Sequence, residues 1–488
     1  MPRQPALLPR LTPAASGVSS RAIAALLDRL HEQSVECHSL VVVRRGHVIA
    51  EGWWAPYSAD RPHLLYSLSK SFTSIAVGLT IAEGLLSLQD RVVDVLRDHV
   101  PEDVSEQGRR ITVHHLLTMT TGHAGDSLEE AWRLEPGDLT KGFLRVPFTE
   151  LEGTRHAYDN ATTYVLARMV EQVTGRSLSD LLEERLFQPM GILDAEWDRL
   201  ASGAAFGFHG LHLRTEAVAA FGELLLREGA WKGRQLVPAD WVRLATRRHI
   251  ETLHAADGPW DADSNAGYGY QFWMSREGYR GEGAYEQFCM VYPEHDLVVA
   301  VTAGDGPHGA AVGAVQDRLL PGLDEPDDDH DDEVLARRLQ SLSFAPVPGL
   351  ADPARSAAAR IDASAPGSAL PEAIEVTLVP MDGGWHLRLG ASTGAATESP
   401  AESFIEVAVG HGGWRESSPL GRPVVATGAW QGETFVADLY VITTPHRVRL
   451  LLDRSTGTAV ATWSTVPLTT PDLRVHLRSP LRTRPDVA

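Results

Sequence analysis

The chain has 488 residues and a formal net charge of −20, so it is long enough for two or three domains and has no basic excess. An acidic chain without a basic stripe excludes nucleic acid as an expected partner. Two cysteines do not make a disulfide framework, residues 1–17 lack an apolar signal stretch, and no segment has the length and apolarity of a membrane span. We therefore expect a cytoplasmic protein with no membrane partner.

The first predicted elements are a helix over residues 20–31 and a hairpin that turns at Arg45-Gly46. Residues 90–200 are predicted to be mainly helical, and sheet returns after them. The predicted strands are 39–43, 48–54, 267–274, 287–292 and 297–302. This order predicts an α+β fold: an antiparallel sheet flanked by helices, with an inserted all-α subdomain and a cleft between the two.

Lys70 is one of three lysines in a chain with 41 arginines, and it lies in an apolar stretch. Burial can lower the pKa of a lysine, whereas arginine keeps its proton at accessible pH. Ser67 lies three residues earlier, and a helix places both on one face. The apolar run after Lys70 ends at Gly84 and predicts a buried helix whose start favours a nucleophile. The alternative is that Ser67 caps the helix and Lys70 is a surface residue.

A second candidate group comes from Tyr158-Asp159-Asn160. Asn160 is predicted to cap a helix that is closed by Gly175. Tyr158 then lies in the loop before this helix, where its phenol can face the predicted cleft. Ser67, Lys70 and Tyr158 together form a hypothesis of nucleophilic catalysis in which the serine hydroxyl loses its proton to a nearby group.

These segments resemble the penicillin-recognising serine hydrolases, and most closely the class C β-lactamase-like branch that includes esterases and aminohexanoate-oligomer hydrolases. Residues 66–74 look like the nucleophile segment of that family, and Tyr158-Asp159-Asn160 matches its Tyr-x-Asn element. Residues 111–122 and 229–238 are similar to two further signatures. The likeness covers about residues 20–320, and the order and spacing of the motifs make it specific.

The chain departs from the family at the third element, a Lys-Thr-Gly motif on a strand. Its counterpart here is Gly281-Glu282-Gly283, which has no lysine at Gly281 and adds a negative charge at Glu282. Because a cation usually binds an anionic ligand, this difference puts recognition of a β-lactam or peptide carboxylate in doubt. Glu286 stands where relatives usually have glycine, and the sequence offers no reason for it.

The resemblance implies a mechanism with named roles. Ser67 attacks a carbonyl carbon, while Lys70 and Tyr158 share the removal and delivery of its proton. The backbone amides of Ser67 and Ala284 form the oxyanion hole, and the implied supporting residues are Asn160, Gly281 and Gly283. Whether Lys70 or Tyr158 is the base stays open at this point, since a coupled pair titrates as a unit.

The leading interpretation is a serine hydrolase that cleaves a small ester or amide through an acyl-serine. The alternatives are a β-lactamase or D-stereospecific peptidase, and a binding sensor that keeps the pocket without turnover. No Gly-x-Ser-x-Gly elbow occurs, which disfavours an α/β-hydrolase. The histidines at 114–115 and 209–212 lack cysteines or acids at ligand spacing, so we expect no metal and no cofactor. The natural substrate and the oligomeric state stay open.

Residues 324–333 contain eight acids, a run typical of a solvated linker, with a calcium site as the weaker alternative. A short helix over 334–342 and a Pro/Ala/Ser-rich segment over 345–371 follow. The strands predicted after them are 374–379, 385–389, 404–409, 424–430, 435–442, 447–452 and 460–465. They indicate a small antiparallel barrel or sandwich with a packing role. The predicted domains are 1–323, a linker over 324–372, and 373–488.

Overall fold

The computed structural model of the chain describes residues 5–200, 202–252, 262–325, 329–352, 354–390 and 404–478. The chain divides into two compact units. The first, which we call the sandwich unit, takes its described residues from Met1–Gly52 and Leu64–Gln340. The second, the barrel unit, takes them from Trp53–His63 and Ser341–Thr483. The barrel unit thus includes a short segment from the N-terminal part of the sequence.

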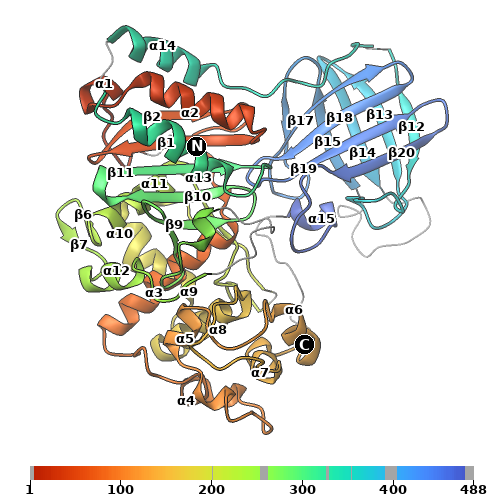
Figure 1. Ribbon diagram of the computed structural model, residues 1–488. Coiled ribbons are helices and arrows are strands. Elements are labelled where there is room, and N and C mark those ends of the chain that lie inside the picture. Colours follow the sequence, from red (N-terminus) through yellow and green to blue (C-terminus); the bar gives the residue numbers. More distant parts are fainter. Residues whose placement is uncertain are drawn as a thin grey trace. The chain divides into compact units, whose positions relative to one another are not determined.

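A six-stranded sheet is the centre of the sandwich unit in the residues described, with the order β2-β1-β11-β10-β9-β8. Its strands are β1 (Cys37–Arg44), β2 (His47–Trp53), β8 (Trp273–Ser275), β9 (Gly278–Gly283), β10 (Gln287–Tyr292) and β11 (Leu297–Ala303). Figure 1 shows the red β1 beside the green β11, so strands from both ends of this unit are neighbours. Neighbours from β1 to β8 pair antiparallel.

Every residue of β1 and of β11 is buried, which indicates that both faces of this sheet are covered. Helix α11 packs against β1, β10 and β11, while α13 and α14 pack on α2. The helices are α1 (Pro13–Ser16), α2 (Ser20–Glu32), α3 (Ser69–Ala82), α4 (Val92–Val95), α5 (Val113–Leu117), α6 (Leu128–Leu134), α7 (Leu139–Arg145), α8 (Asn160–Thr174), α9 (Leu178–Leu182), α10 (Gln188–Met190), α11 (Thr215–Leu226), α12 (Ala239–Ala245), α13 (Ala310–Ala314) and α14 (Asp329–Gln340).

The remaining elements of this unit are short. They are the strands β3 (His63–Leu64), whose first residue is the last one of the barrel unit's N-terminal segment, β4 (Glu196–Trp197), β5 (Leu211–Leu213), β6 (Ala230–Trp231) and β7 (Arg234–Gln235). Single 3-10 or π turns lie at Tyr66–Leu68, Arg97–His99, Gly108–Arg110, Glu183–Phe187, Ala262–Asn265, Pro293–His295, Val315–Leu319 and Leu320–Gly322. Helices α4 to α8 gather below the sheet in Figure 1 and form the expected all-α subdomain. The predicted α+β fold is confirmed.

One strand prediction was wrong. The segment 267–274 was expected to be a single strand, but the strand β8 begins only at Trp273, and Tyr268 forms isolated bridges with Ile250 and Trp273. Left-handed backbone at Gly267 (φ 109°) and Gln271 (φ 65°) breaks the extended conformation, and the Ser71 hydroxyl binds the Gln271 carbonyl. Strand β9, which follows β8, contains the predicted counterpart of the Lys-Thr-Gly motif.

The barrel unit is a closed eight-stranded barrel over the described residues 354–390 and 404–478. Its strand order is β15-β14-β13-β12-β20-β19-β18-β17, β15 pairs with β17 to close the ring, and β16 adds to the edge of β17. The elements are β12 (Ala357–Ile361), β13 (Glu375–Met381), β14 (Gly384–Gly390), β15 (Phe404–Gly410), β16 (Arg415–Ser417), β17 (Val424–Gln431), β18 (Thr434–Val441), β19 (Arg447–Asp453), β20 (Thr458–Trp463) and α15 (Leu473–His476). The sequence predicted either a small antiparallel barrel or a β-sandwich for this C-terminal domain, and the structure shows the barrel.

The interior of this barrel is filled by apolar side chains. Trp385, Leu387, Val407 and Phe435 are almost completely buried within one core cluster. The alternation of buried and exposed residues along β13 and β14 places these side chains inside, as expected for a small barrel. The described interior is therefore a packed core.

The segment predicted as a linker over 324–372 contains regular structure. Residues 326–328 lie outside the described part, but Asp329 begins α14 and the carboxylate of Asp332 accepts from Ser20 Oγ. Part of the acidic run is therefore helical and packs on α2, where the Asp332 carboxylate accepts a hydrogen bond from Ser20. Strand β12 also lies in this segment. It pairs with β13 on one side and β20 on the other and so connects these two strands within the barrel.

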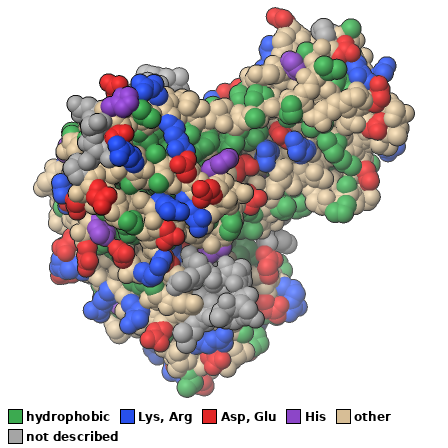
Figure 2. Space-filling view, turned by 45° about the horizontal axis from the view of Figure 1, so that its top comes forward, with side chains coloured by type: hydrophobic (Ala, Val, Ile, Leu, Met, Phe, Trp, Pro, Cys, Tyr) green, Lys and Arg blue, Asp and Glu red, His purple; other side chains and the backbone are tan. Residues whose placement is uncertain are grey.

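No helix in the described ranges is both long and apolar enough to cross a bilayer. Figure 2 shows acidic and basic side chains interspersed over the visible face of each unit. Both cysteines, Cys37 and Cys289, are free and buried.

Candidate active site

Ser67 lies in a tight turn directly before α3. A single 3-10 turn spans Tyr66–Leu68, and Tyr66 adopts a left-handed backbone with φ 49°. Ser67 is half-buried, which leaves its hydroxyl accessible. The neighbouring serines are different: Ser69 Oγ donates to the Tyr66 carbonyl at 2.6 Å and Ser71 Oγ to the Gln271 carbonyl at 2.9 Å. These two hydroxyls fix the backbone around the turn, and Ser67 is the serine that faces Lys70.

The Lys70 ammonium group is buried against three oxygen atoms. Its Nζ lies 2.9 Å from Ser67 Oγ, 2.7 Å from Asn160 Oδ1 and 3.1 Å from the carbonyl of Phe208. Asn160 Nδ2 donates to Asp126 Oδ2 at 2.6 Å, so the amide oxygen must face the lysine. Two of the three neighbours of Nζ are therefore acceptors only, and the third is a hydroxyl that can also donate.

The environment of Lys70 allows a substantial fraction of neutral amine near neutral pH. Burial lowers its pKa to about 7, and the carboxylates of Asp126 and Asp159 limit that decrease. Helix α3 is buried from Ser69 through Thr80, so no water-exposed face is available to the lysine side chain. An arginine at this position would keep its proton in the same surroundings.

The phenol of Tyr158 shares a hydrogen bond with Ser67. Its ring lies 4.7 Å from Lys70 Nζ and is stacked on Trp273 at 5.8 Å, with Tyr268 edge-on to the same indole. Burial raises the pKa of Tyr158 well above its usual value, against the hydrogen bond with Ser67 that lowers it. The phenol therefore keeps its proton and can act as a donor.

The cap at the start of α8 differs from the sequence prediction. Asp159, not Asn160, is the N-cap residue, and its carboxylate accepts from the Ala161 amide at 2.9 Å. The same carboxylate accepts from Ser127 Oγ and lies 3.2 Å from His123 Nδ1. Buried partners of this kind select Asp159 as the cap, which leaves the Asn160 side chain available to Lys70.

The glycines of β9 bring that strand against the nucleophile turn. A Cβ atom on Gly283 would lie 2.0 Å from the Leu65 carbonyl oxygen, and one on Gly281 would lie 2.2 Å from Leu68 Cδ1. Only glycine permits this approach. Strand β8 pairs with β9 from Gly278 to Arg280 alone, so the last residues of β9 lie beyond that pairing. Ala284, the second expected oxyanion donor, follows directly and is half-buried.

Glu282 lies between these glycines and is held by two basic groups. Arg280 Nε donates to Glu282 Oε2 at 2.7 Å, and His308 Nε2 lies 2.9 Å from Oε1. Burial favours the neutral acid, but Arg280 and His308 outweigh it and lower the pKa of Glu282. This carboxylate also raises the pKa of Tyr158, so negative charge occurs close to the position where relatives have a lysine.

The Glu286 carboxylate, which the sequence left unexplained, accepts from the backbone amides of Gly309 and Ala311 at 2.7 and 2.8 Å. Burial raises its pKa to about 7, while the two amides act in the opposite direction. Glu286 therefore joins the β9–β10 turn to the start of α13.

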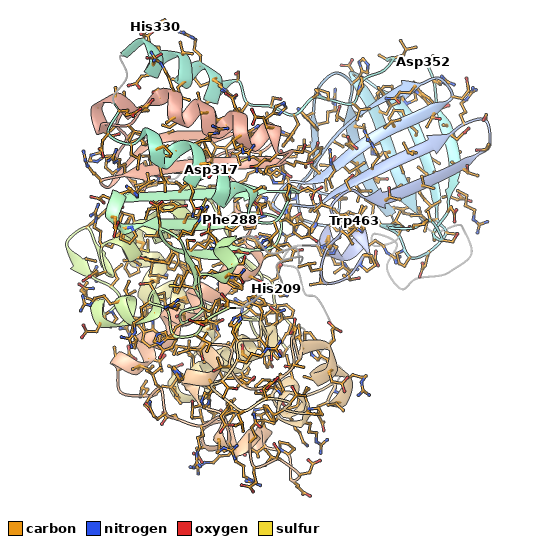
Figure 3. All side chains as sticks on the ribbon, viewed as in Figure 1. His209, Phe288, Asp317, His330, Asp352 and Trp463 are labelled. Atoms are coloured by element: carbon orange, nitrogen blue, oxygen red, sulfur yellow. The ribbon has the colours of Figure 1, made fainter. Side chains whose placement is uncertain are left out.

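Sequence reasoning missed three contributors to this site: Asp126, the Phe208 carbonyl and Gln271. Gln271 accepts from Thr163 Oγ1 at 2.6 Å and donates to the carbonyls of Leu116 and Leu117, which ties α8 to α5. Figure 3 shows the labelled His209, next to Phe208, where the helical subdomain meets the sheet-bearing part. No local pattern signals any of the three, because each role depends on a partner distant in sequence.

A family model described as Beta-lactamase matches residues 21–321. The 6-aminohexanoate-dimer hydrolase of Paenarthrobacter ureafaciens is 27% identical over 313 residues, which cover 59% of this chain and 78% of that protein. Penicillin-binding protein 4 of Amycolatopsis lactamdurans is 31% identical over 224 residues, covering 43% of this chain and 56% of that protein. Esterase EstB of Burkholderia gladioli is 29% identical over 213 residues, covering 38% and 54%. The chain thus spans little more than half the length of the last two.

Solved structures show the same fold at low identity. A putative 6-aminohexanoate-dimer hydrolase from Bacillus anthracis superposes with a TM-score of 0.50 at 20% identity, over 60% of this chain and 80% of that one. A putative beta-lactamase from Bacteroides dorei has a TM-score of 0.50 at 14% identity, over 61% of this chain and 98% of that one.

Proposed function

The chain belongs to the β-lactamase family, and from that premise we propose that it cleaves a small ester or amide through an acyl-Ser67 intermediate. It is a hydrolytic enzyme of this family of serine hydrolases, whose relatives here carry the names hydrolase, esterase and aminopeptidase. The proposal assigns Ser67 as nucleophile, Lys70 as base and Tyr158 as proton donor, in the class C-like arrangement of a Ser-x-x-Lys motif with a Tyr-x-Asn motif.

One observation carries this proposal: the set of hydrogen-bond partners around Lys70 Nζ. A neutral amine has two N–H groups and one lone pair. Asn160 Oδ1 and the Phe208 carbonyl accept the two N–H groups, which leaves the lone pair for the hydroxyl proton of Ser67. The lowered pKa of Lys70, about 7, supports this protonation state. The surroundings therefore suit a lysine that takes the proton of Ser67 as the serine attacks.

Tyr158 completes the proton path in this proposal. Its raised pKa keeps the phenol protonated, and its hydrogen bond with Ser67 places that proton beside the reacting oxygen. As the tetrahedral intermediate collapses, the phenol gives a proton to the leaving group and is restored from Lys70. The backbone amides of Ser67 and Ala284 would hold the oxyanion, and such a donor is worth about 2.7–4 kcal/mol in comparable hydrolases. Water then cleaves the acyl-enzyme.

The charge near β9 supports a substrate without a carboxylate. Gly281 stands where relatives have a cation for an anionic ligand, and the neighbouring Glu282 adds a carboxylate, which is paired with Arg280. We therefore propose aryl and short-chain esters, or neutral amides, as the substrate class, with β-lactams as poor substrates. Turnover of a chromogenic cephalosporin at a rate that matches the best ester would contradict this choice and favour the β-lactamase or peptidase alternative.

The proposal also includes a cytoplasmic site of action for the protein. The two free, buried thiols of Cys37 and Cys289 support it, since disulfides are the usual state of paired cysteines in exported proteins. Cell fractionation with an antibody against the native protein tests this placement.

Covalent labelling tests the mechanism directly. A fluorophosphonate should add its mass to the peptide that contains Ser67, and Ser67→Ala should lose both labelling and turnover. Ser71→Ala is the matched control, because Ser71 lies one turn further along the chain, on α3, and its hydroxyl donates to the Gln271 carbonyl. This variant should still be labelled at Ser67. Labelling at Ser69 or Ser71, or full activity of Ser67→Ala, would overturn the assignment, and acylation without release would favour the sensor alternative.

A further inference from the structure

The turn between β9 and β10 has an unusual backbone. Tyr285 and Glu286 both adopt left-handed conformations, with φ angles of 65° and 60°. Glycine takes such a conformation without penalty, whereas a side chain with a Cβ atom does so at a cost. A glutamate that keeps this conformation, in a turn next to Ala284, therefore requires an interaction that glycine cannot make.

The side chain of Glu286 supplies that interaction. It is 4% exposed, and its two oxygens accept separately from the amides of Gly309 and Ala311, at 2.7 and 2.8 Å. Both oxygens are thereby bound where the chain enters α13. The carboxylate fixes the end of the turn to a neighbouring element.

The other half of the turn is held by Gln287. Its side-chain amide donates to the carbonyls of Ala284, Tyr285 and Ala303, at 3.2, 2.6 and 2.7 Å. These bonds set the orientation of the peptide planes on either side of Tyr285. The turn is thus held through its carbonyls by Gln287 and through the Glu286 side chain by α13.

This turn also packs against the turn that carries the nucleophile. The rings of Tyr66 and Tyr285 meet edge to face at a centroid distance of 5.3 Å, and Gly283 lies against the Leu65 carbonyl. The residue before Ser67 and the residue after Ala284 therefore touch. A shift of either turn changes the distance between the two backbone amides that would bind one oxyanion.

We propose that Glu286 is a positioning residue that aligns the backbone amide of Ala284 with that of Ser67 for oxyanion binding. The inference rests on the acyl-serine mechanism proposed above and adds a residue to it. Glu286 acts through the turn and contacts neither the nucleophile nor its proton partners. A rate effect in its variants would come from the alignment of a donor.

The test compares Glu286→Gly and Glu286→Gln with the unaltered enzyme on a small aryl ester. Glycine removes the carboxylate and also relieves the backbone strain, so a purely local cost of strain would disappear. Because loss of a whole oxyanion donor costs about 100- to 1,000-fold in kcat, a misaligned one should cost about 10- to 100-fold. KM should stay within about threefold, since the ground-state ester lacks the oxyanion. Glutamine, which keeps one acceptor oxygen, should show a smaller decrease in kcat.

Glu216→Gln is the matched control. Glu216 is a buried carboxylate that also accepts from two backbone amides, those of Leu7 and Leu8, but it lies on α11. This variant should lower Tm without changing kcat. A boronic acid that mimics the tetrahedral intermediate adds a second readout, because its affinity should fall in parallel with kcat in the Glu286 variants only.

The outcomes separate this inference from the proposed function. If the unaltered enzyme is not labelled at Ser67 by a fluorophosphonate, the proposed function fails and this inference fails with it. If it is labelled and Glu286→Gly keeps full kcat and full boronic acid affinity, Glu286 is an anchor for α13 only and this inference alone is overturned. If Glu286→Gly does not fold, Glu286→Gln decides by the same two measurements.

Discussion

The sandwich unit and the barrel unit place backbone strain differently. Every non-glycine residue with a left-handed φ in the described ranges lies in the sandwich unit, whereas the left-handed residues of the barrel unit are glycines in its turns and loops. The strained residues around the proposed catalytic side chains are Tyr66, Met119, Gln271, Tyr285 and Glu286. Strain of this kind costs about 1–3 kcal/mol per residue and persists where the surroundings enforce it. The unit that contains the proposed catalytic residues is therefore also the unit that contains non-glycine backbone strain.

The two units also differ in what they bury at their centres. The sandwich unit buries Lys70 beside Ser67 and Gln271 between α8 and α5, each among hydrogen-bond partners. The barrel core buries Trp385 and Phe435 among aliphatic side chains. Buried polar networks specify geometry, whereas an apolar core supplies stability. The predictions below test whether activity follows this division.

The largest effect is expected from the base. Lys70→Arg keeps a positive charge and similar reach but cannot give up its proton. Loss of a general base costs about 100- to 10,000-fold, so Lys70→Arg should lose activity nearly as completely as Lys70→Ala. Steady-state kinetics on an aryl ester measures this. Substantial activity in the arginine variant would show that the lysine contributes charge and not basicity.

A strand glycine should come next. In Gly283→Ala the new Cβ would meet the Leu65 carbonyl at 2.0 Å, and that backbone must move. Overpacking of this type costs about 1–3 kcal/mol of stability, and a shift of about 1 Å at a reacting group costs about 100-fold in rate. Gly313→Ala in α13 is the control, because nothing lies within 4 Å of its Cβ position. Equal rates in the two variants would show that β9 does not set the geometry of the nucleophile turn.

The pH profile should show the titration of the lysine. The pKa of Lys70 is lowered to about 7, so the amine is protonated below pH 7 and cannot accept the proton of Ser67. The value of kcat/KM should therefore rise as pH increases through 7 and should be about tenfold below its plateau at pH 6. The raised pKa of Tyr158 predicts no decrease from the phenol at mildly alkaline pH. A profile that is flat from pH 5 to 8 would contradict the assignment of Lys70 as base.

The sequence predicted correctly those features of the fold and the site that depend on a local pattern of residues. The spacing of Ser67 and Lys70 predicts their contact, and the 3-10 turn Tyr66–Leu68 continues directly into α3, so a single turn brings the two side chains together. Barrel strands such as β14 alternate buried and exposed residues and were found nearly to their ends. Strand β12 was missed because Ala357–Ile361 alternates weakly and pairs through partners distant in sequence.

The rest of the site depends on contacts that local patterns do not contain. Asp159 and Asn160 are equally good cap residues, and the choice follows from His123 and Ser127, which reach Asp159 from a separate loop. Asp126 reads as an ordinary turn residue until the Asn160 amide is placed beside it. The reason for a glutamate at position 286 becomes apparent only from its bonds to the backbone amides of Gly309 and Ala311, which follow β11. Long-range partners decide these roles.

The smallest effect is expected on the surface of the barrel. Arg388 on β14 and Glu406 on β15 are cross-strand neighbours, with Arg388 Nε 3.5 Å from Glu406 Oε1, and their side chains are 46% and 53% exposed. Exposed pairs of this kind contribute about 0–1 kcal/mol, and surface changes usually stay within about 0.5 kcal/mol of stability. Exchange of the two charges, in the double variant Arg388→Glu and Glu406→Arg, should leave kcat/KM for a small ester within about threefold. Circular dichroism and Tm verify that the variant is folded. If activity falls by more than tenfold in the folded variant, part of the site lies on the barrel and the division between a strained catalytic unit and a packed structural unit fails.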